Sequence, residues 1–170
     1  MPMDGLSETV EIKEFMGNRR GLLDLLLIAD EQLEMVEKYL DRGKMLVLED
    51  NGEIKAECLI TDEGSKVLEI KNIAVEPHSQ GKGYGKALID FLVQAYCNEY
   101  DFLQVGTGDS PLTVPFYEKR GFVRHHVVRD FFTENYDHSI IEAGVQLKDM
   151  VFLRKTMKLL TLSELYTKLE

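Results

Sequence analysis

The most informative part of this chain for its fold is the stretch Lys71-Asn-Ile-Ala-Val-Glu-Pro-His-Ser-Gln-Gly-Lys-Gly-Tyr-Gly-Lys-Ala-Leu-Ile-Asp90. It predicts a short apolar strand, a proline break, a glycine turn and the start of a helix. Gly81, Gly83 and Gly85 keep side chains away from the backbone at the point where the helix begins. Unpaired N–H groups and the positive end of the helix dipole converge there, so the turn predicts a site for a phosphate-bearing ligand.

The spacing of the glycines narrows the kind of phosphate site. A Walker loop needs Gly-x-x-x-x-Gly-Lys-Ser/Thr, and this spacing does not occur in the chain. A dinucleotide fingerprint that starts at Gly81 needs a third glycine at position 86, which is Lys86. The pattern that fits is Gln-x-x-Gly-x-Gly, formed by Gln80, Gly83 and Gly85. Taken alone, this pattern leaves open a plain turn between strand and helix that binds nothing.

Length and composition indicate one globular domain that spans residues 1–170. Hydrophobic residues make up 44% and charged residues 29% of the chain, which is ordinary for a soluble protein. The net charge of −10 and the pI near 4.9 argue against a nucleic-acid partner, because such proteins usually present a basic face. The same charge is compatible with a cationic substrate.

The sequence also indicates a cytoplasmic protein without a membrane partner. Residues 1–4 have neither the basic region nor the apolar core of a secretory signal. The longest apolar run, Leu25–Ala29, is far too short to span a bilayer. Cys58 and Cys97 each lie in an apolar segment, which favours buried thiols in a reducing compartment over a disulfide.

Hydrophobic periodicity predicts a mixed α/β fold around a largely antiparallel sheet. The two strands that flank the glycine-loop helix should run parallel, because a crossover joins them. The expected strands are Val10–Lys13, Met45–Leu48, Ile54–Ile60, Val67–Val75, Phe102–Val105, Phe122–Phe132 and Val145–Arg154. The expected helices cover Gly21–Leu40 with a new start near Asp30, Tyr84–Tyr96, Val114–Lys119 and a last helix that Thr161 and Glu164 open as a capping box. Asn51-Gly52 predicts a type I′ hairpin turn, and Thr133–Gly144 a polar loop.

A second motif, Phe116-Tyr-Glu-Lys-Arg-Gly-Phe122, follows the glycine loop at a fixed distance. Together with Gln80-x-x-Gly-x-Gly, it resembles the signature of the GNAT superfamily of N-acetyltransferases, in particular the small bacterial type. The resemblance spans about residues 45–130. It implies a GNAT fold, in which the parallel pair splays around an acetyl-CoA site and helices cover both faces of the sheet.

The resemblance implies a set of acetyl-CoA contacts. The backbone groups of Ile73 and Val75 would meet the pantetheine arm and the thioester, and Gln80 to Gly85 would hold the pyrophosphate. The far wall would follow the next strand, where the family often has an asparagine and this chain has Asp109, which either replaces it or caps the next helix. The implied contact residues are Ile73, Ala74, Val75, Gln80, Gly81, Lys82, Gly83, Tyr84, Gly85, Lys86, Thr107, Asp109, Ser110 and Phe116.

Two residues are candidates for the proton transfers that acyl transfer to an amine requires. The resemblance implies that Tyr117 protonates the leaving thiolate; the alternative is a buried structural aromatic. Glu69 stands where the histone-acetylating branch of the family carries its catalytic glutamate. Strict alternation would place it on the strand face of Ile73, as a general base that acts directly or through water. The alternative is a glutamate held in a salt bridge, for example with Lys71.

Three functions are compatible with the sequence. The first is an N-acetyltransferase that moves the acetyl group of acetyl-CoA to a primary amine, on a small molecule or on a protein or peptide. The second is a non-catalytic acyl-CoA-binding module on the same fold, and the third is an unrelated nucleotide-binding domain. No metal is expected, because His125 and His126 should point to opposite faces of a strand. The sequence names no acceptor, and a homodimer is the expected assembly.

Overall fold

The computed structural model describes residues 6–157 and residue 167. Its main sheet contains β1 (Val10–Glu14), β2 (Lys44–Asp50), β3 (Glu53–Asp62), β4 (Val67–Val75), β5 (Phe102–Gly108), β6 (Val123–Val128) and β9 (Met150–Thr156). The helices are α1 (Leu23–Ala29), α2 (Leu33–Glu37), α3 (Tyr84–Tyr96), α4 (Val114–Glu118) and α5 (Phe131–Asn135), with short 3₁₀ turns at Arg19–Leu22 and Pro77–Ser79. A separate small hairpin joins β7 (Ile141–Glu142) to β8 (Val145–Gln146).

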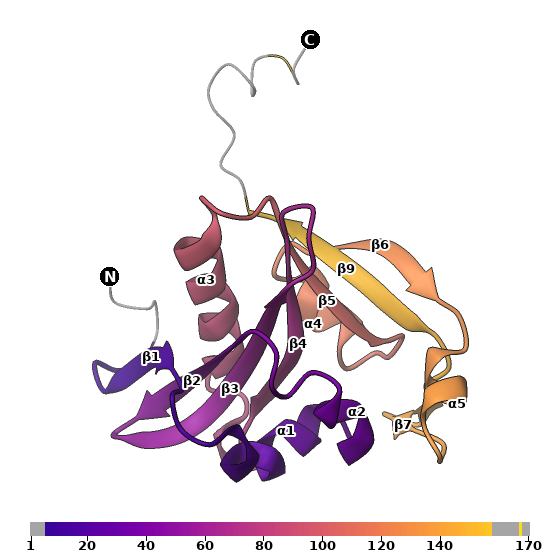
Figure 1. Ribbon diagram of the computed structural model, residues 1–170, viewed down its shortest axis with the longest axis horizontal. Helices are drawn as coiled ribbons and strands as arrows, with labels where there is room; N and C mark the ends of the chain where they lie inside the picture. The colour runs from indigo at the N-terminus through magenta and orange to yellow at the C-terminus, as the bar shows by residue number, and fades with distance from the viewer. Residues whose placement is uncertain (1–5, 158–166, 168–170) are drawn as a thin grey trace.

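The strands of the main sheet lie in the order β1-β2-β3-β4-β5-β9-β6 (Figure 1). Within this sheet, β4 and β5 run parallel and the other neighbouring strands run antiparallel. The parallel pairing extends only from Val67 opposite Phe102 to Ile70 opposite Val105. Beyond that point β4 continues to Val75 and β5 to Gly108 without pairing with each other, so the two strands part. This confirms the predicted sheet with a splayed parallel pair.

Helices cover both faces of the sheet, as predicted. On one face, α3 and α4 bury side chains such as Leu88, Leu92 and Tyr117 against β2–β5. On the other face, α1 and α2 pack Leu26 and Val36 against the opposite side chains of β2 and β3. Alternate residues of β2 and β3 therefore enter different cores, which is the expected period of two for strands buried on both sides.

Most predicted elements agree with the structure because their signals are local. The strand Val67–Val75 has the predicted bounds. The turn between β2 and β3 has positive φ at both Asn51 (52°) and Gly52 (80°), as a type I′ turn requires. The alternation of β4 is interrupted once: Leu59 pairs with Asn72 but its neighbour Ile60 pairs with Ile70. Lys71 is thus an extra residue in the strand, a β-bulge that no residue pattern predicted.

Two predicted strands differ from the structure. The strand expected over Phe122–Phe132 ends at Val128, because Asp130 adopts a left-handed φ of 55° and Phe131 then begins α5. Phe132 packs instead with Ile140 and Leu147 in a third, small cluster. The strand expected over Val145–Arg154 is divided between β8 and β9. The last predicted helix, opened by Thr161 and Glu164, lies outside the described residues.

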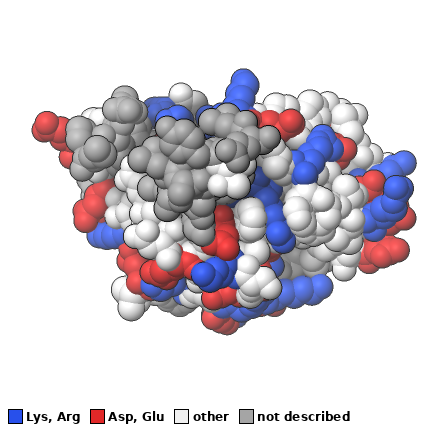
Figure 2. Space-filling view, turned by 90° about the horizontal axis from the view of Figure 1, so that it is seen from above, with Lys and Arg blue, Asp and Glu red and all other residues white. Residues whose placement is uncertain are grey.

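Cys58 is buried and Cys97 half-buried, and neither forms a disulfide. Figure 2 shows that Lys and Arg lie among Asp and Glu on one face, with neither sign dominating the part that is not grey. Among the described residues, no helix has the length and apolar character needed to cross a bilayer.

A glycine in the turn before β2 provides a test of this packing. Gly43 has a φ of +54°, and a Cβ there would lie 1.9 Å from the backbone oxygen of Ile60. We expect Gly43→Ala to lower the free energy of unfolding by about 3 kcal/mol or more, because the clash forces backbone movement. Gly64 is the matched control, since its φ is +82° but nothing lies within 4 Å of the added Cβ. Gly64→Ala should cost only about 1 kcal/mol in urea unfolding; equal losses in the two variants would contradict the prediction.

Candidate active site

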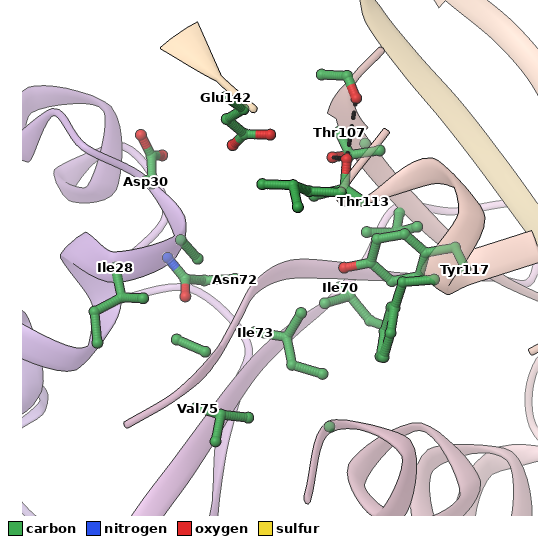
Figure 3. Close-up of a pocket in the computed structure, with 18 of the residues that line it drawn as sticks. Ile28, Asp30, Ile70, Asn72, Ile73, Val75, Thr107, Thr113, Tyr117 and Glu142 are labelled. Atoms are coloured by element: carbon green, nitrogen blue, oxygen red, sulfur yellow. Dashed lines mark hydrogen bonds between the residues drawn. The ribbon is translucent and has the colours of Figure 1, made fainter. Parts of the chain in front are cut away.

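A cavity of about 830 Å³ lies where β4 and β5 part (Figure 3). Its floor and walls include Ile70–Val75 of β4 and Val105–Gly108 of β5. The glycine loop closes one end, and the end of α1 together with β7 borders the other. This volume is in the range of small-molecule and cofactor sites.

The glycine loop presents free backbone donors to the cavity. Gly81 and Gly83 have φ values of +79° and +87°, and nothing lies within 4 Å of the position of an added Cβ at either residue. Gly83 is the N-cap of the 13-residue helix α3 and provides no side-chain cap. The N–H groups of the first helical turn therefore lack intrahelical partners and face open space. This geometry is suited to a phosphate or pyrophosphate group.

Side chains around the loop add positive charge and rigidity. Lys86 and Arg120 both line this end of the cavity. Lys86 pairs with Asp90 at 3.0 Å, and the Arg120 guanidinium lies 4.0 Å above the ring of Phe116. The Gln80 Nε2 donates to the backbone oxygen of Val75 at 3.2 Å and so fastens the loop to the end of β4.

The parted segment of β4 directs backbone groups toward the cavity. The N–H of Glu76 donates to the oxygen of Lys55 on β3 at 2.8 Å. Because backbone direction alternates along a strand, Ala74 also faces β3, and Ile73 and Val75 face the side from which β5 has departed. These are the two residues whose backbone the sequence analysis placed against the acyl-carrying arm.

The far wall differs in part from the expected contacts. Thr107 lines the cavity, and its hydroxyl lies 2.9 Å from that of Thr113. Asp109 and Ser110 are not among the lining residues. Asp109 pairs with Arg124 at 3.1 Å, and the Ser110 hydroxyl accepts from the N–H of Leu112 at 3.0 Å. The expected capping role of Asp109 is wrong, because Thr113 is the N-cap of α4.

Ten further predicted contact residues line the cavity, and one does not. The lining includes Ile73, Ala74, Val75, Gln80, Gly81, Gly83, Tyr84, Gly85, Lys86 and Phe116. Lys82 is exposed and lies outside the lining. The buried Tyr84 also braces β2, because its hydroxyl donates to Asp50 at 2.5 Å.

Tyr117 projects its hydroxyl into the cavity (Figure 3). The residue is 7% exposed, and its ring packs edge-on against Phe116 and Phe122. Among the described residues the hydroxyl has no hydrogen-bond partner. Burial raises the pKa of Tyr117 well above its ordinary value, so the hydroxyl keeps its proton at neutral pH. A neutral, unpaired donor in a cavity has the properties of a general acid.

Glu69 lies outside the cavity lining and is held by other side chains. Its carboxylate accepts from Gln104 Nε2 at 2.5 Å and pairs with Lys71, and Gln104 in turn accepts from Arg154 at 2.7 Å. The expectation that Glu69 shares a strand face with Ile73 is wrong, because the bulge at Lys71 reverses the alternation. The salt bridge with Lys71 is the alternative that the sequence analysis had left open.

Several cavity residues escaped the sequence analysis. Asp30 follows α1, and its two oxygens accept from the hydroxyls of Tyr39 at 3.0 Å and Tyr136 at 2.7 Å. Burial raises the pKa of Asp30. Glu142 of β7 lines the same end, and one of its carboxylate oxygens is buried without a partner among the described residues. No motif marks these residues, because the fold brings them together from distant segments.

The two histidines of β6 differ from the expected geometry. A register shift between Arg124 and His126 places His125 in a bulge, and the two Nδ1 atoms lie 2.8 Å apart. The expectation that the rings point to opposite faces is therefore wrong. No group of three potential metal-ligating side chains occurs in the part of the chain that the structure describes.

A splayed parallel pair, a glycine loop at a helix start and a tyrosine in the cavity between them define an acetyltransferase of the GNAT class. Comparison with known proteins agrees, since residues 41–124 match the family described as an acetyltransferase (GNAT) domain. The chain belongs to this family. It is 37% identical over 134 residues to an uncharacterized N-acetyltransferase of Bacillus subtilis, an alignment that covers 78% of this chain and 86% of the relative.

Solved structures show the same likeness. A GNAT family acetyltransferase from Elizabethkingia anophelis with acetyl-CoA bound has a TM-score of 0.82 and 30% identity, over 88% of this chain and 99% of that one. A Bacillus subtilis acetyltransferase in complex with CoA has a TM-score of 0.79 and 34% identity, over 89% and 99%. An IAA acetyltransferase from Bacillus cereus has a TM-score of 0.78 and 33% identity, over 86% and 99%.

The glycine loop can be tested by obstructing it. We expect Gly83→Glu to abolish CoA binding, because a side chain and a negative charge would occupy the space in front of the first-turn N–H groups. Gly64→Glu is the control: φ at Gly64 is similar and its surroundings are equally open, but it does not line the cavity. Isothermal titration with CoA should show binding to the control and none to Gly83→Glu. Equal affinity in both variants would remove the loop from the binding site.

Proposed function

We propose that this protein transfers the acetyl group of acetyl-CoA to a primary amine by direct attack in a ternary complex. One observation carries the proposal: a single cavity connects the anion-binding start of α3 to the unpaired hydroxyl of Tyr117. A phosphate-bearing thioester that enters along β4 would bring its acyl group toward that hydroxyl. The acetyl-CoA and CoA bound to the relatives from Elizabethkingia anophelis and Bacillus subtilis support this choice of cosubstrate.

The residues of the chain suit distinct parts of acetyl-CoA. The first-turn N–H groups of α3, with Lys86 and Arg120, would bind the pyrophosphate. The backbone groups of Ile73 and the N–H of Val75, which face the side that β5 has left, would pair with the amides of the arm as an added strand does. A backbone N–H on this open edge would also stabilise the negative charge that develops on the carbonyl oxygen.

The reaction forms one bond and breaks another at the same carbon. The neutral amine attacks the thioester carbonyl to form a C–N bond, and the C–S bond then breaks. Tyr117 donates its proton to the departing sulfur, and the proton that the amine loses passes to a base or to water. The products are the N-acetylated amine and CoA. Small-molecule and protein or peptide amines both meet these requirements.

A non-catalytic acyl-CoA-binding module is the less favoured alternative. Such a module has no use for a hydroxyl that faces the ligand space without a partner among the described residues, whereas acyl transfer needs a proton donor there. An acetyl-CoA turnover screen across classes of amine, with release of free thiol as the readout, separates the two functions. CoA binding without thiol release on any amine would support the binding module. The homodimer and the cytoplasmic location stay predictions.

Tyr117→Phe tests the general acid. The variant removes a hydroxyl that has no partner in the described structure, so folding and acetyl-CoA affinity should stay nearly unchanged. The kcat should fall by roughly 10²–10⁴-fold, the usual contribution of general acid catalysis. Tyr100→Phe serves as the control, because its hydroxyl binds Asp62 away from the cavity. A kcat equal to that of the wild type would make Tyr117 a structural aromatic.

Glu69→Gln tests the other proton transfer. Glu69 as general base stays a prediction, but its contacts with Lys71 and Gln104 favour a structural role. We therefore expect the variant to lose stability, by roughly 1–3 kcal/mol for a weakened buried charge network, and to keep the pH dependence of kcat/KM. A profile that is depressed most at low pH and recovers as free amine accumulates would instead establish Glu69 as the base.

A further inference from the structure

The cavity has opposite charges at its two ends. Lys86 and Arg120 line the end at the glycine loop. Asp30, Glu31 and Glu142 line the other end, where the segments after α1 and α5 meet. Figure 3 shows the Asp30 and Glu142 carboxylates on different elements, with the Tyr117 hydroxyl across the cavity from them. The anionic cosubstrate accounts for the positive end and leaves the negative end without an explanation.

The carboxylates of the negative end are not neutralised by the protein. The Asp30 carboxylate accepts from the hydroxyls of Tyr39 and Tyr136 and from the backbone of Gln32, and no Lys or Arg among the described residues pairs with Asp30 or Glu142. Lys71, the lysine of the neighbouring wall, is already paired with Glu63 and Glu69. In the part of the chain that the structure describes, Glu31 contacts His138 at 3.7 Å, and Asp137 together with Glu31 raises the pKa of that histidine.

Keeping such carboxylates together in a partly buried site costs free energy. Burial raises the pKa of Asp30, which is the expected response to this cost. The partnerless oxygen of Glu142 is a second sign that a donor is missing from this end. Across the cavity from these carboxylates, the hydroxyl of Tyr117, a residue that is 7% exposed, also lacks a partner among the described residues, so the space between the two sides lacks a polar occupant. A ligand with N–H donors and positive charge would satisfy these groups.

Apolar and aromatic side chains also line the cavity. Phe132, Tyr136 and Ile140 are among them. The stacked rings of Phe132 and Tyr136, with centroids 5.4 Å apart, are suited to a methylene chain and to a cation above a ring. The lining therefore matches a hydrocarbon stem with a charged group at its far end.

We propose that the acceptor is a small amine with a second cationic centre, which Glu142 and Asp30 bind while the free amine meets the thioester near Tyr117. The proposal rests on the proposed acetyl transfer and adds the class of acceptor. Glu142 is the specificity-determining residue that is easiest to change, because Asp30 also links Tyr39 and Tyr136 and is needed for packing.

The test compares two acceptors that differ in one charged group. Putrescine is butylamine with a second amine, and the wild type should use putrescine with at least about tenfold higher kcat/KM, the contribution of one hydrogen bond to a charged group. Glu142→Gln should lose about tenfold with putrescine and little with butylamine. Glu134→Gln is the control: it removes the same charge from α5 at an exposed residue outside the lining and should change neither value.

Each outcome decides one of the two proposals. Equal use of the two amines by the wild type, or an equal loss of both in Glu142→Gln, would overturn recognition of a second charge but leave acetyl transfer intact. If neither amine is acetylated, the proposed reaction fails for these amines. Titration of the CoA-loaded protein with putrescine and with butylamine then tests recognition of the second charge separately. Tighter binding of putrescine than of butylamine that disappears in Glu142→Gln would support it, and equal binding would overturn it.

Discussion

The architecture of the site depends on where the hydrogen bonding between β4 and β5 stops. Beyond Ile70 and Val105 the two strands no longer pair, and the backbone groups on the facing edge of β4 lose their strand partners. Buried backbone groups need partners, so an edge of this kind favours a ligand that supplies them. The same parting leaves room for the cavity and sets the start of α3 at its end. The cavity and the open edge of β4 are thus both consequences of the point at which this pairing stops.

The two ends of the cavity are built in different ways. The donor end, which would hold acetyl-CoA, is formed by β4, the glycine loop, α3, β5 and α4, a continuous part of the chain. The other end, the proposed acceptor end, contains Asp30 and Glu142, and Asp30 is joined across the fold to the hydroxyls of Tyr39 and Tyr136. Local backbone geometry governs the first end, and long-range side-chain contacts govern the second.

This difference explains how far the sequence predicted the site. The glycine loop could be predicted because its features are local. Gly83 has a positive φ, and the helix begins at the next residue. The bulge at Lys71 was not readable, because pairing with β3 produces it, and so Glu69 was placed on the wrong face. The sequence predicted Phe131 within a strand, but in the structure the left-handed conformation of Asp130 ends the extended chain and Phe131 begins α5. Asp30 had no readable role, because its tyrosine partners come from other segments.

The link between Asp30 and Tyr136 also has an evolutionary consequence. The segments that it joins flank the donor end on both sides in sequence and contribute little to it. Substitutions in the α1–α2 region or in residues 131–149 would therefore reshape the acceptor end while the machinery for acetyl-CoA stays constant. Because the hydrogen bond between Tyr136 and Asp30 joins the two flanks, a change at one of these residues would require a compensating change at the other to keep that end of the cavity intact.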